Sequence, residues 1–319
     1  MKKLLTILCA VVCACCFCFS MVGCSEEPIT YTKLANGTYE VTKVNIEGTT
    51  VEIPATYKDA PVTAIGENVF MGSAIEKVVL PASVKNIGAS AFKSCKKLQA
   101  INLGKVETIG VNAFNGAGAK DKLTELDLTS VKTLSNGAFS GCEYLKKVTF
   151  SENLTEIPAK AFSSCTLLST VKGITAVKNI GTSAFSGCSL LSNMDFSKIE
   201  YIADEAFSSC VTLSEIDMQS IVELGIRAFQ SCTSLYEVTI GANCVKFYKQ
   251  TFYGCTSLKY INLVDPTNWY SYGVNSNDPS IIYGPNKTNL DVMSDSREAA
   301  KAIIATAWDH GNYYVKIVD

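Results

Sequence analysis

The chain is 319 residues long and is poor in histidine, because His310, which follows Asp309, is the only one. An Asp-His pair can orient a general base, but the sequence contains no GxSxG elbow that would supply a nucleophile for it. The HExxH, EF-hand and GxxxxGK[ST] patterns are also absent. These absences argue against the common hydrolase, metalloprotease and nucleotide-binding classes. We therefore predict a protein that is not an enzyme and that uses no metal or cofactor.

The chain also carries little net charge. Its 28 Lys and Arg residues oppose 30 Asp and Glu residues, which gives a formal charge of −2. Such a chain has no electrostatic reason to bind nucleic acid. Apolar residues make up 47% of the sequence, enough for a substantial core in one large domain or two small ones.

The first 24 residues have the features of an export signal. Lys2 and Lys3 precede the apolar run LLTILCAVVCACCFCFSMV, and small residues follow it. Closely spaced thiols in this run are potential metal ligands, but in a signal sequence cysteine acts as a small hydrophobe.

The end of this segment, Met21-Val22-Gly23-Cys24, resembles the lipobox of bacterial lipoproteins. The resemblance implies a signal peptide at 1–23, a diacylated Cys24 and a short tether at 24–37. It also implies an extracytoplasmic protein that is lipid-anchored at the bacterial cell surface. The alternative is simple secretion with cleavage nearby.

Phenylalanine recurs along most of the chain with a period near 23. The successive spacings are 22, 22, 25, 23, 23, 22, 22 and 23, between Phe70, Phe92, Phe114, Phe139, Phe162, Phe185, Phe207, Phe229 and Phe252. Similar residues, mostly Ile, Leu or Val, stand five and eight positions before each of them. A fixed period of this length indicates stacked repeats, in which each unit buries its apolar side chains against the next.

A short segment with apolar residues at its fourth and sixth places recurs in step with phenylalanine, and this alternation predicts strands. The segments are IEKVVL (75–80), LQAINL (98–103), LTELDL (123–128), LKKVTF (145–150), LSTVKG (168–173), LSNMDF (191–196), LSEIDM (213–218), LYEVTI (235–240) and LKYINL (258–263). The unit after Phe114 carries the insertion NGAGAKDK (115–122), which we predict to form a bulging loop.

The repeat, LxxIxLxxxVxxIGxxAFxxC, resembles the BspA-type leucine-rich repeat from about Val51 to Val264. The resemblance implies a leucine-rich repeat solenoid, either α/β or mainly β. It would be a curved right-handed stack of about nine 22–25-residue repeats with one parallel β-sheet. We expect the repeat domain, with its N-terminal cap, to span 38–264. A C-terminal cap at 265–319 would include a helix from Arg297 to Trp308.

Cysteine stands three residues after most of the repeated phenylalanines, at Cys95, Cys142, Cys165, Cys188, Cys210, Cys232 and Cys255. Ser73 and Ala117 fill the same place in the other two units. A small buried position accepts Cys, Ser or Ala, whereas a disulfide framework or metal site would not lose members in this way. Neighbouring turns about 4.8 Å apart fall within disulfide range, but parallel Cβ vectors disfavour the required torsion. We predict a reduced structural ladder of Phe and Cys, with disulfides and metal binding as alternatives.

The third and fifth places of each predicted strand point away from the core. They define a predicted binding face that contains Glu125, Asp127, Lys147, Lys172, Asp195, Glu215, Asp217, Glu237 and Tyr260. A lysine-bearing middle gives way to an acidic run along this face. Carboxylates on neighbouring turns of an open sheet do not oppose each other across a cleft, as a glycoside hydrolase requires. The alternative is a solvated surface whose charges discourage aggregation.

The segment NWYSYG brings together Trp269, Tyr270 and Tyr272. Their aromatic faces would stack on sugars or anchor a protein partner, or else cover the last open turn of the solenoid.

Taken with the family resemblance, these features predict a surface-exposed binding or adhesion protein. Its partners would be an extracellular protein or glycan, and the membrane through the N-terminal lipid. The competing hypothesis is a cell-envelope accessory protein that docks a partner of the same cell, for example in polysaccharide handling.

Overall fold

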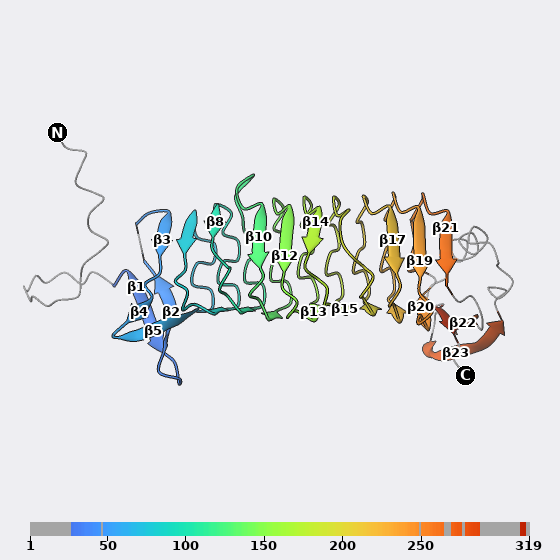
Figure 1. Cartoon of the computed structure of the whole chain (residues 1–319), viewed down its shortest axis with the longest axis horizontal. Coiled ribbons are helices and arrows are strands. Elements are labelled where there is room, and N and C mark those ends of the chain that lie inside the picture. The colour runs from blue at the N-terminus through green and yellow to red at the C-terminus, as the bar shows by residue number, and fades with distance from the viewer. Residues whose placement is uncertain are drawn as a thin grey trace, which may run out of the picture.

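The computed structural model describes residues 27–45, 47–248, 250–264, 269–275, 278–287 and 313–316. These residues form an elongated solenoid in which every turn repeats the path of the turn before it (Figure 1). The predicted leucine-rich repeat solenoid is confirmed, and it is mainly β: the described segments contain strands and turns but no helix. Accordingly, they include no helix long and apolar enough to cross a membrane.

Eight of the nine predicted strands, together with one strand at 50–52 that was not predicted, line one side of the solenoid and are called here the first ladder. It consists of β3 (Thr50–Glu52), β6 (Lys77–Val79), β8 (Ala100–Ile101), β10 (Glu125–Leu128), β12 (Lys147–Phe150), β14 (Thr170–Lys172), β17 (Glu215–Met218), β19 (Glu237–Ile240) and β21 (Tyr260–Leu263). All pairing within it is parallel, in three groups: β3-β6-β8, β10-β12-β14 and β17-β19-β21.

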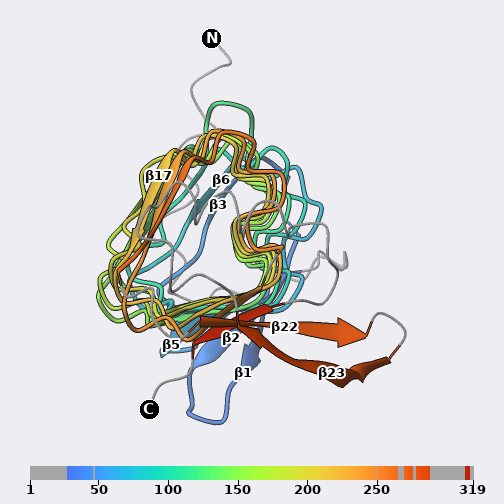
Figure 2. The same cartoon turned by 90° about the vertical axis from the view of Figure 1, so that its right-hand side faces the viewer.

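A second parallel ladder, which the sequence analysis did not predict, runs along the base of the solenoid (Figure 2). It consists of β5 (Ala60–Ile65), β7 (Asn86–Ile87), β9 (Thr108–Ile109), β11 (Thr133–Leu134), β13 (Glu156–Ile157), β15 (Asn179–Ile180), β16 (Tyr201–Ile202), β18 (Glu223–Leu224) and β20 (Lys246–Tyr248). Most of its strands are two residues long. Each contributes the apolar residue that lies five positions before phenylalanine, and that side chain is buried.

The remaining side of each turn contains no strand but is still tied to its neighbours. The amide of each repeated phenylalanine from Phe70 to Phe229 donates to a carbonyl of the following turn, as Phe162 N does to Ala184 O and Phe185 N to Ala206 O, both at 2.8 Å. These bonds give the buried turn backbone the partners that burial requires. Successive phenylalanine rings stack from Phe70 to Phe252, with centroids 4.9–5.7 Å apart and interplanar angles of 6–9°.

One predicted strand is missing. Residues 191–196 form only an isolated bridge, between Asn193 and Thr170. The preceding strand β14 ends at Lys172 because Gly173 adopts a left-handed φ of 75°. Residues beyond Asn193 therefore have no extended partner, and the prediction of a strand there is wrong.

Further strands extend the second ladder at both ends. At the N-terminal end, β1 (Ile29–Lys33) pairs antiparallel with β2 (Tyr39–Val44), which pairs parallel with β5, while β4 (Thr56–Tyr57) pairs antiparallel with β5. At the other end, β24 (Tyr313–Lys316) lies antiparallel between β20 and β22 (Trp269–Asn275), and β23 (Asp278–Lys287) follows β22. The helix expected from Arg297 to Trp308 lies outside the described residues.

Candidate binding surface

The first ladder presents two columns of outward side chains, because its parallel pairing keeps equivalent residues in register. Glu125 aligns with Lys147, and Asp127 aligns with Thr149 and then Lys172. The same columns resume in β17, β19 and β21, as Glu215-Glu237-Tyr260 and Asp217-Thr239-Asn262. Of the nine residues of the predicted face, Glu125, Asp127, Lys172, Asp195, Glu215 and Asp217 are exposed, while Lys147, Glu237 and Tyr260 are half-buried.

The middle of this surface is mixed in sign. Lys147 Nζ lies 3.2 Å from Glu125 Oε2 on the neighbouring turn, so one of the two expected positive charges is paired. Lys172 is exposed. An exposed pair of this kind contributes little to stability, about 0–1 kcal/mol. The acidic run from Asp195 to Glu237 is thus the stronger charge feature of the surface.

The aspartates of the second column also accept hydrogen bonds from the residues two positions after them. Asp127 Oδ1 accepts from Thr129 N at 3.0 Å and from Thr129 Oγ1 at 2.6 Å. The hydroxyl bond, then the amide bond, lowers the pKa of the Asp127 carboxyl below its ordinary value. Asp195 accepts from Ser197 N at 2.9 Å in the same way, and Asp217 accepts from the Gln219 side-chain amide at 2.7 Å.

Aromatic rings adjoin the acidic end. Tyr260 packs edge-on against Tyr236, with centroids 5.2 Å apart, and Lys259 Nζ lies 5.3 Å above the Tyr236 ring. Beside them, Glu237 Oε1 accepts from Asn262 Nδ2 at 2.7 Å. Sequence reasoning missed Tyr236, since it stands at the second place of its segment rather than in either outward column. The exposed fraction of the Tyr236 side chain depends on how the neighbouring strands β19 and β21 are placed.

A hollow of about 640 Å³ opens in the first ladder between β8 and β10, which are not hydrogen-bonded to each other. Asn102, Glu125, Asp127, Lys147 and Thr149 line it, so it gathers part of the predicted face. The insertion at 115–122, predicted as a loop, lies outside the strands and lengthens this turn (Figure 1, the green loop above β8 and β10). The sequence showed the insertion, but it did not show that the flanking strands β8 and β10 would not pair with each other.

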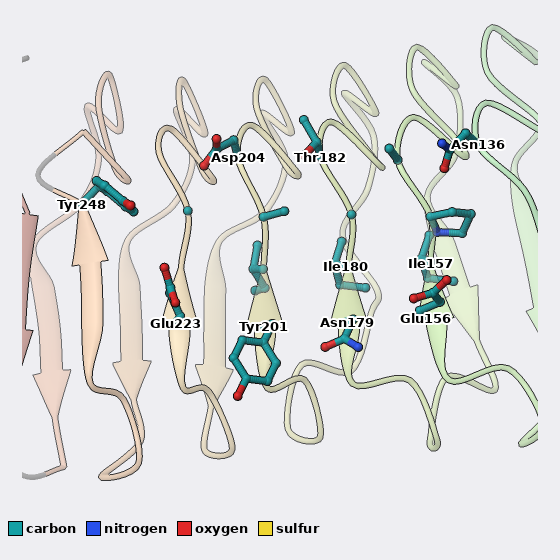
Figure 3. Close-up of a pocket in the computed structure, with 16 residues that line it drawn as sticks. Asn136, Glu156, Ile157, Asn179, Ile180, Thr182, Tyr201, Asp204, Glu223 and Tyr248 are labelled. Atoms are coloured by element: carbon teal, nitrogen blue, oxygen red, sulfur yellow. The ribbon is translucent and has the colours of Figure 1, made fainter. Parts of the chain in front are cut away.

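A second groove, of about 600 Å³, is lined by residues of six successive turns of the second ladder (Figure 3). Its floor is a row of small residues, Pro158, Gly181, Ala203 and Gly225. Sequence reasoning missed this groove because it overlooked the second ladder. The signal was present in the residue that starts each two-residue strand, six positions before phenylalanine, and in the small residue that follows the strand, four positions before phenylalanine.

The repeated cysteines lie in the core with free thiols. Each of the seven donates through Sγ to the carbonyl of a phenylalanine one turn earlier, over 2.9–3.2 Å; Cys188, for example, bonds to Phe162 O. Burial raises the pKa of the Cys142 and Cys188 thiols to about 12. Such thiols are poor nucleophiles at neutral pH. Within the described residues, no group of His, Cys, Asp and Glu could hold a metal ion.

Some of the remaining predicted residues lie in a described strand, and the others lie outside the described residues. Trp269, Tyr270 and Tyr272 lie in β22, whose backbone pairs antiparallel with β23 and β24. Cys24, the signal segment 1–23 and the Asp309-His310 pair lie outside the described residues.

Comparison with known families found one match, to the BspA type leucine rich repeat region, in six copies over residues 63–192, 107–223 and 171–277. No curated protein sequence matches the chain significantly.

Several solved structures are similar. A leucine rich cell surface protein from Faecalibacterium prausnitzii is 20% identical, with 76% of this chain and 95% of that chain covered and a TM-score of 0.43. A leucine-rich repeat protein from Bacteroides ovatus is 25% identical, with 74% and 93% covered and a TM-score of 0.29. The pneumococcal vaccine antigen PcpA is 20% identical, with 74% and 86% covered and a TM-score of 0.39.

Proposed function

Because the chain belongs to the BspA-type leucine-rich repeat family, we propose that it is a non-enzymatic binding protein that uses its first ladder to contact a protein or glycan outside the cell. Solenoids offer extended surfaces whose outward residues vary over a constant core. The observation that carries the proposal is the acidic end of the two columns, where Asp195, Glu215 and Asp217 are exposed beside the Tyr236-Tyr260 pair.

Charge and aromatic surface have complementary roles in such a contact. Exposed carboxylates speed association with a basic partner, and this effect weakens as salt is added. Tyrosine supplies large contact area at small entropic cost. The surface therefore suits a partner with a basic patch next to an apolar or sugar-bearing one.

The proposal includes the location. The lipobox-like Met21-Val22-Gly23-Cys24 supports removal of 1–23 and diacylation of Cys24. The tether expected at 24–37 would be shorter than the sequence predicted, because β1 (Ile29–Lys33) already pairs with β2, and it would hold the solenoid at the bacterial surface. Residues 265–319 would then serve as the C-terminal cap at the far end from the lipid.

The binding test is a screen of the purified protein against extracellular-matrix proteins and a glycan array. The informative variant combines Asp195→Asn, Glu215→Gln and Asp217→Asn, which removes three charges but retains the side-chain oxygens that accept hydrogen bonds at positions 195 and 217. We expect affinity to fall at least tenfold at low salt. The control, Glu67→Gln with Glu143→Gln and Glu152→Gln, changes three exposed carboxylates outside the columns and should bind normally.

A saturable ligand that binds the charge-depleted variant as tightly as the original would refute the first ladder as the binding surface. A well-folded protein that binds no matrix protein or glycan would favour the competing role, docking of a partner within the same cell envelope.

The anchor has a separate test. Expressed in a bacterial host with radiolabelled palmitate, the chain should incorporate label and fractionate with membranes. Cys24→Ala should abolish the label, whereas Cys18→Ala, within the signal run, should leave it. Unlabelled wild-type protein in the medium would show secretion without an anchor.

A further inference from the structure

The groove of the second ladder has the form of a linear track. The small residues Pro158, Gly181, Ala203 and Gly225 line it, and its labelled polar side chains form two walls (Figure 3). The first residues of the two-residue strands form one wall: Glu156, Asn179, Tyr201 and Glu223. Asn136, Thr182 and Asp204 stand along the other wall, and Tyr248 lies at one end. From the turn of Asn136 to the turn of Tyr248, five intervals of about 4.8 Å give the track a length of roughly 24 Å.

The floor cannot accept an added peptide strand. Its amides already bond to the preceding turn: Gly181 N to Ile157 O at 2.8 Å, Ala203 N to Ile180 O at 2.9 Å and Gly225 N to Ile202 O at 2.7 Å. Recognition of a peptide by strand addition needs unpaired backbone groups. A ligand in this groove must therefore be recognised by the side chains of the walls.

The walls suit hydroxyl groups. Asn136 and Asn179 carry both donors and acceptors, Thr182 carries a hydroxyl, and the carboxylates accept. Two of the carboxylates are held in place, since Asp204 Oδ1 accepts from Ile226 N at 2.7 Å and Glu223 Oε1 lies 3.3 Å from Lys246 Nζ. Side chains fixed in this way lose little freedom when they bind.

Tyr201 stands in the middle of the track with 45% of its surface exposed, large for an aromatic residue. A sugar ring presents C–H groups on its face and hydroxyls on its edge, so it can stack on the tyrosine while it bonds to both walls. Glu223 is balanced by Lys246, but Glu156 and Asp204 give the track a net negative charge, which opposes a polyanion. The shallow floor offers no deep apolar pocket for the side chain of a protein partner.

We propose that this groove is a second binding site, separate from the first ladder, for an extended neutral glycan. Tyr201 stacks on one sugar ring near the centre. Asn179 and Thr182 bond to hydroxyls on opposite edges of the chain, while Asp204 accepts from a further hydroxyl. The repeated spacing of the turns places equivalent polar groups beside successive sugars.

The test titrates the purified protein with neutral oligosaccharides of glucose, xylose, mannose and N-acetylglucosamine, by calorimetry. We expect saturable binding to at least one series, with affinity that rises with chain length up to the length of the track. Tyr201→Ala should weaken it at least tenfold, while Tyr201→Phe retains the ring and most of the affinity. The matched control Tyr144→Ala removes a half-buried tyrosine that lies in neither proposed surface, and it should have no effect.

The two sites are separable in this experiment. Asp195→Asn with Glu215→Gln and Asp217→Asn should leave oligosaccharide binding unchanged, whatever happens to a first-ladder ligand. The thermal unfolding midpoint of each variant shows that it is folded. Three results would overturn the proposal: no binding by any neutral series at millimolar concentration, equal binding by Tyr201→Ala, or a preference for peptides or anionic polysaccharides.

Discussion

At the scale of single residues, the repeated cysteine shows what a sequence can and cannot reveal. The exchange of Cys for Ser73 and Ala117 at equivalent places predicts a small buried position, and the structure buries all seven cysteines as free thiols. It does not reveal the bond from Cys188 Sγ to Phe162 O, because this bond joins two turns and depends on their offset. The sequence also does not reveal that Tyr201 is exposed, because its exposure follows from its place in the second ladder, which was not predicted.

The buried thiols predict a loss of stability in alkaline solution. In the unfolded chain a thiol ionises near pH 9.0, whereas burial raises the pKa of Cys188 to about 12 in the folded protein. The stabilisation is complete below pH 9, and it is lost as pH rises toward 12 because the unfolded state alone loses protons. At pH 10 each such cysteine costs about 1.4 kcal/mol.

Urea unfolding at half-unit steps from pH 8 to 10.5 measures this loss. The free energy of unfolding should fall with pH, and Cys188→Ala should reduce the slope at pH 10 by about one proton. Equal slopes for the variant and the original protein would contradict a buried, protonated thiol. As a control, a thiol reagent at pH 8 should leave the native cysteines intact and modify them in urea.

At the scale of the strand and the turn, long alternating segments were predictable and two-residue strands were not. Alternation needs at least four residues to be seen, so β10 and β12 were evident while β15 and β16 were not. The break after β14 was missed because Gly173 occupies a place that is apolar elsewhere, and its left-handed φ becomes clear only in the structure.

Gly181 and Gly187 lie in the same turn, but substitution by alanine should destabilise the protein more at Gly181 than at Gly187. A Cβ on Gly187 would lie 3.5 Å from its nearest neighbour, so Gly187→Ala costs only the strain of a φ of 78°, about 1 kcal/mol. A Cβ on Gly181 would lie 2.6 Å from Ala159 N and 2.8 Å from Pro158 C. Because backbone would have to move, Gly181→Ala should cost about 2–3 kcal/mol.

Urea unfolding of the two variants side by side gives the comparison. The critical result is which variant loses more free energy of unfolding. A larger loss for Gly187→Ala than for Gly181→Ala would mean that backbone conformation, rather than the close approach of neighbouring turns, is the stronger requirement for glycine.

At the scale of the whole molecule, the period of phenylalanine was enough to predict a solenoid, since only stacking can bury such short units. The sequence analysis predicted one parallel sheet, whereas the structure has two ladders of parallel strands. The hydrogen-bonded pairing of each ladder is interrupted, and the interruptions fall at different turns. The added strands at the ends, β2 beside β5 and β24 beside β20, cover ladder edges that would otherwise invite pairing with another chain. Their pairing could not be foreseen, because it joins segments that lie outside the repeat.

The phenylalanine stack should make the effect of a cavity depend on its position. Phe185 stacks on rings on both sides, at 5.5 and 5.3 Å, and Phe185→Ala should cost about 3–5 kcal/mol. It should also separate the two halves of the solenoid into units that unfold at different urea concentrations. Phe252 stacks on Phe229 at 5.7 Å near the end of the repeats, so Phe252→Ala should loosen only the last turns.

Hydrogen exchange measured by mass spectrometry distinguishes these outcomes. For Phe252→Ala, protection should fall at 236–264 and persist at 84–160. A uniform loss of protection in this variant would mean that the solenoid unfolds as a single cooperative unit.

The common register of the turns also governs how the gene for this protein can change in length. The two AFSSC stretches, at 161–165 and 206–210, lie 45 residues apart, which is two whole turns. Recombination between their coding sequences would delete or duplicate two complete turns and join residues that already occupy equivalent positions. The strand pairing, the ring stack and the thiol bonds would re-form across the junction. Evolution can therefore lengthen or shorten both ladders, and with them the two proposed binding surfaces, in whole turns while the packing of every turn stays the same.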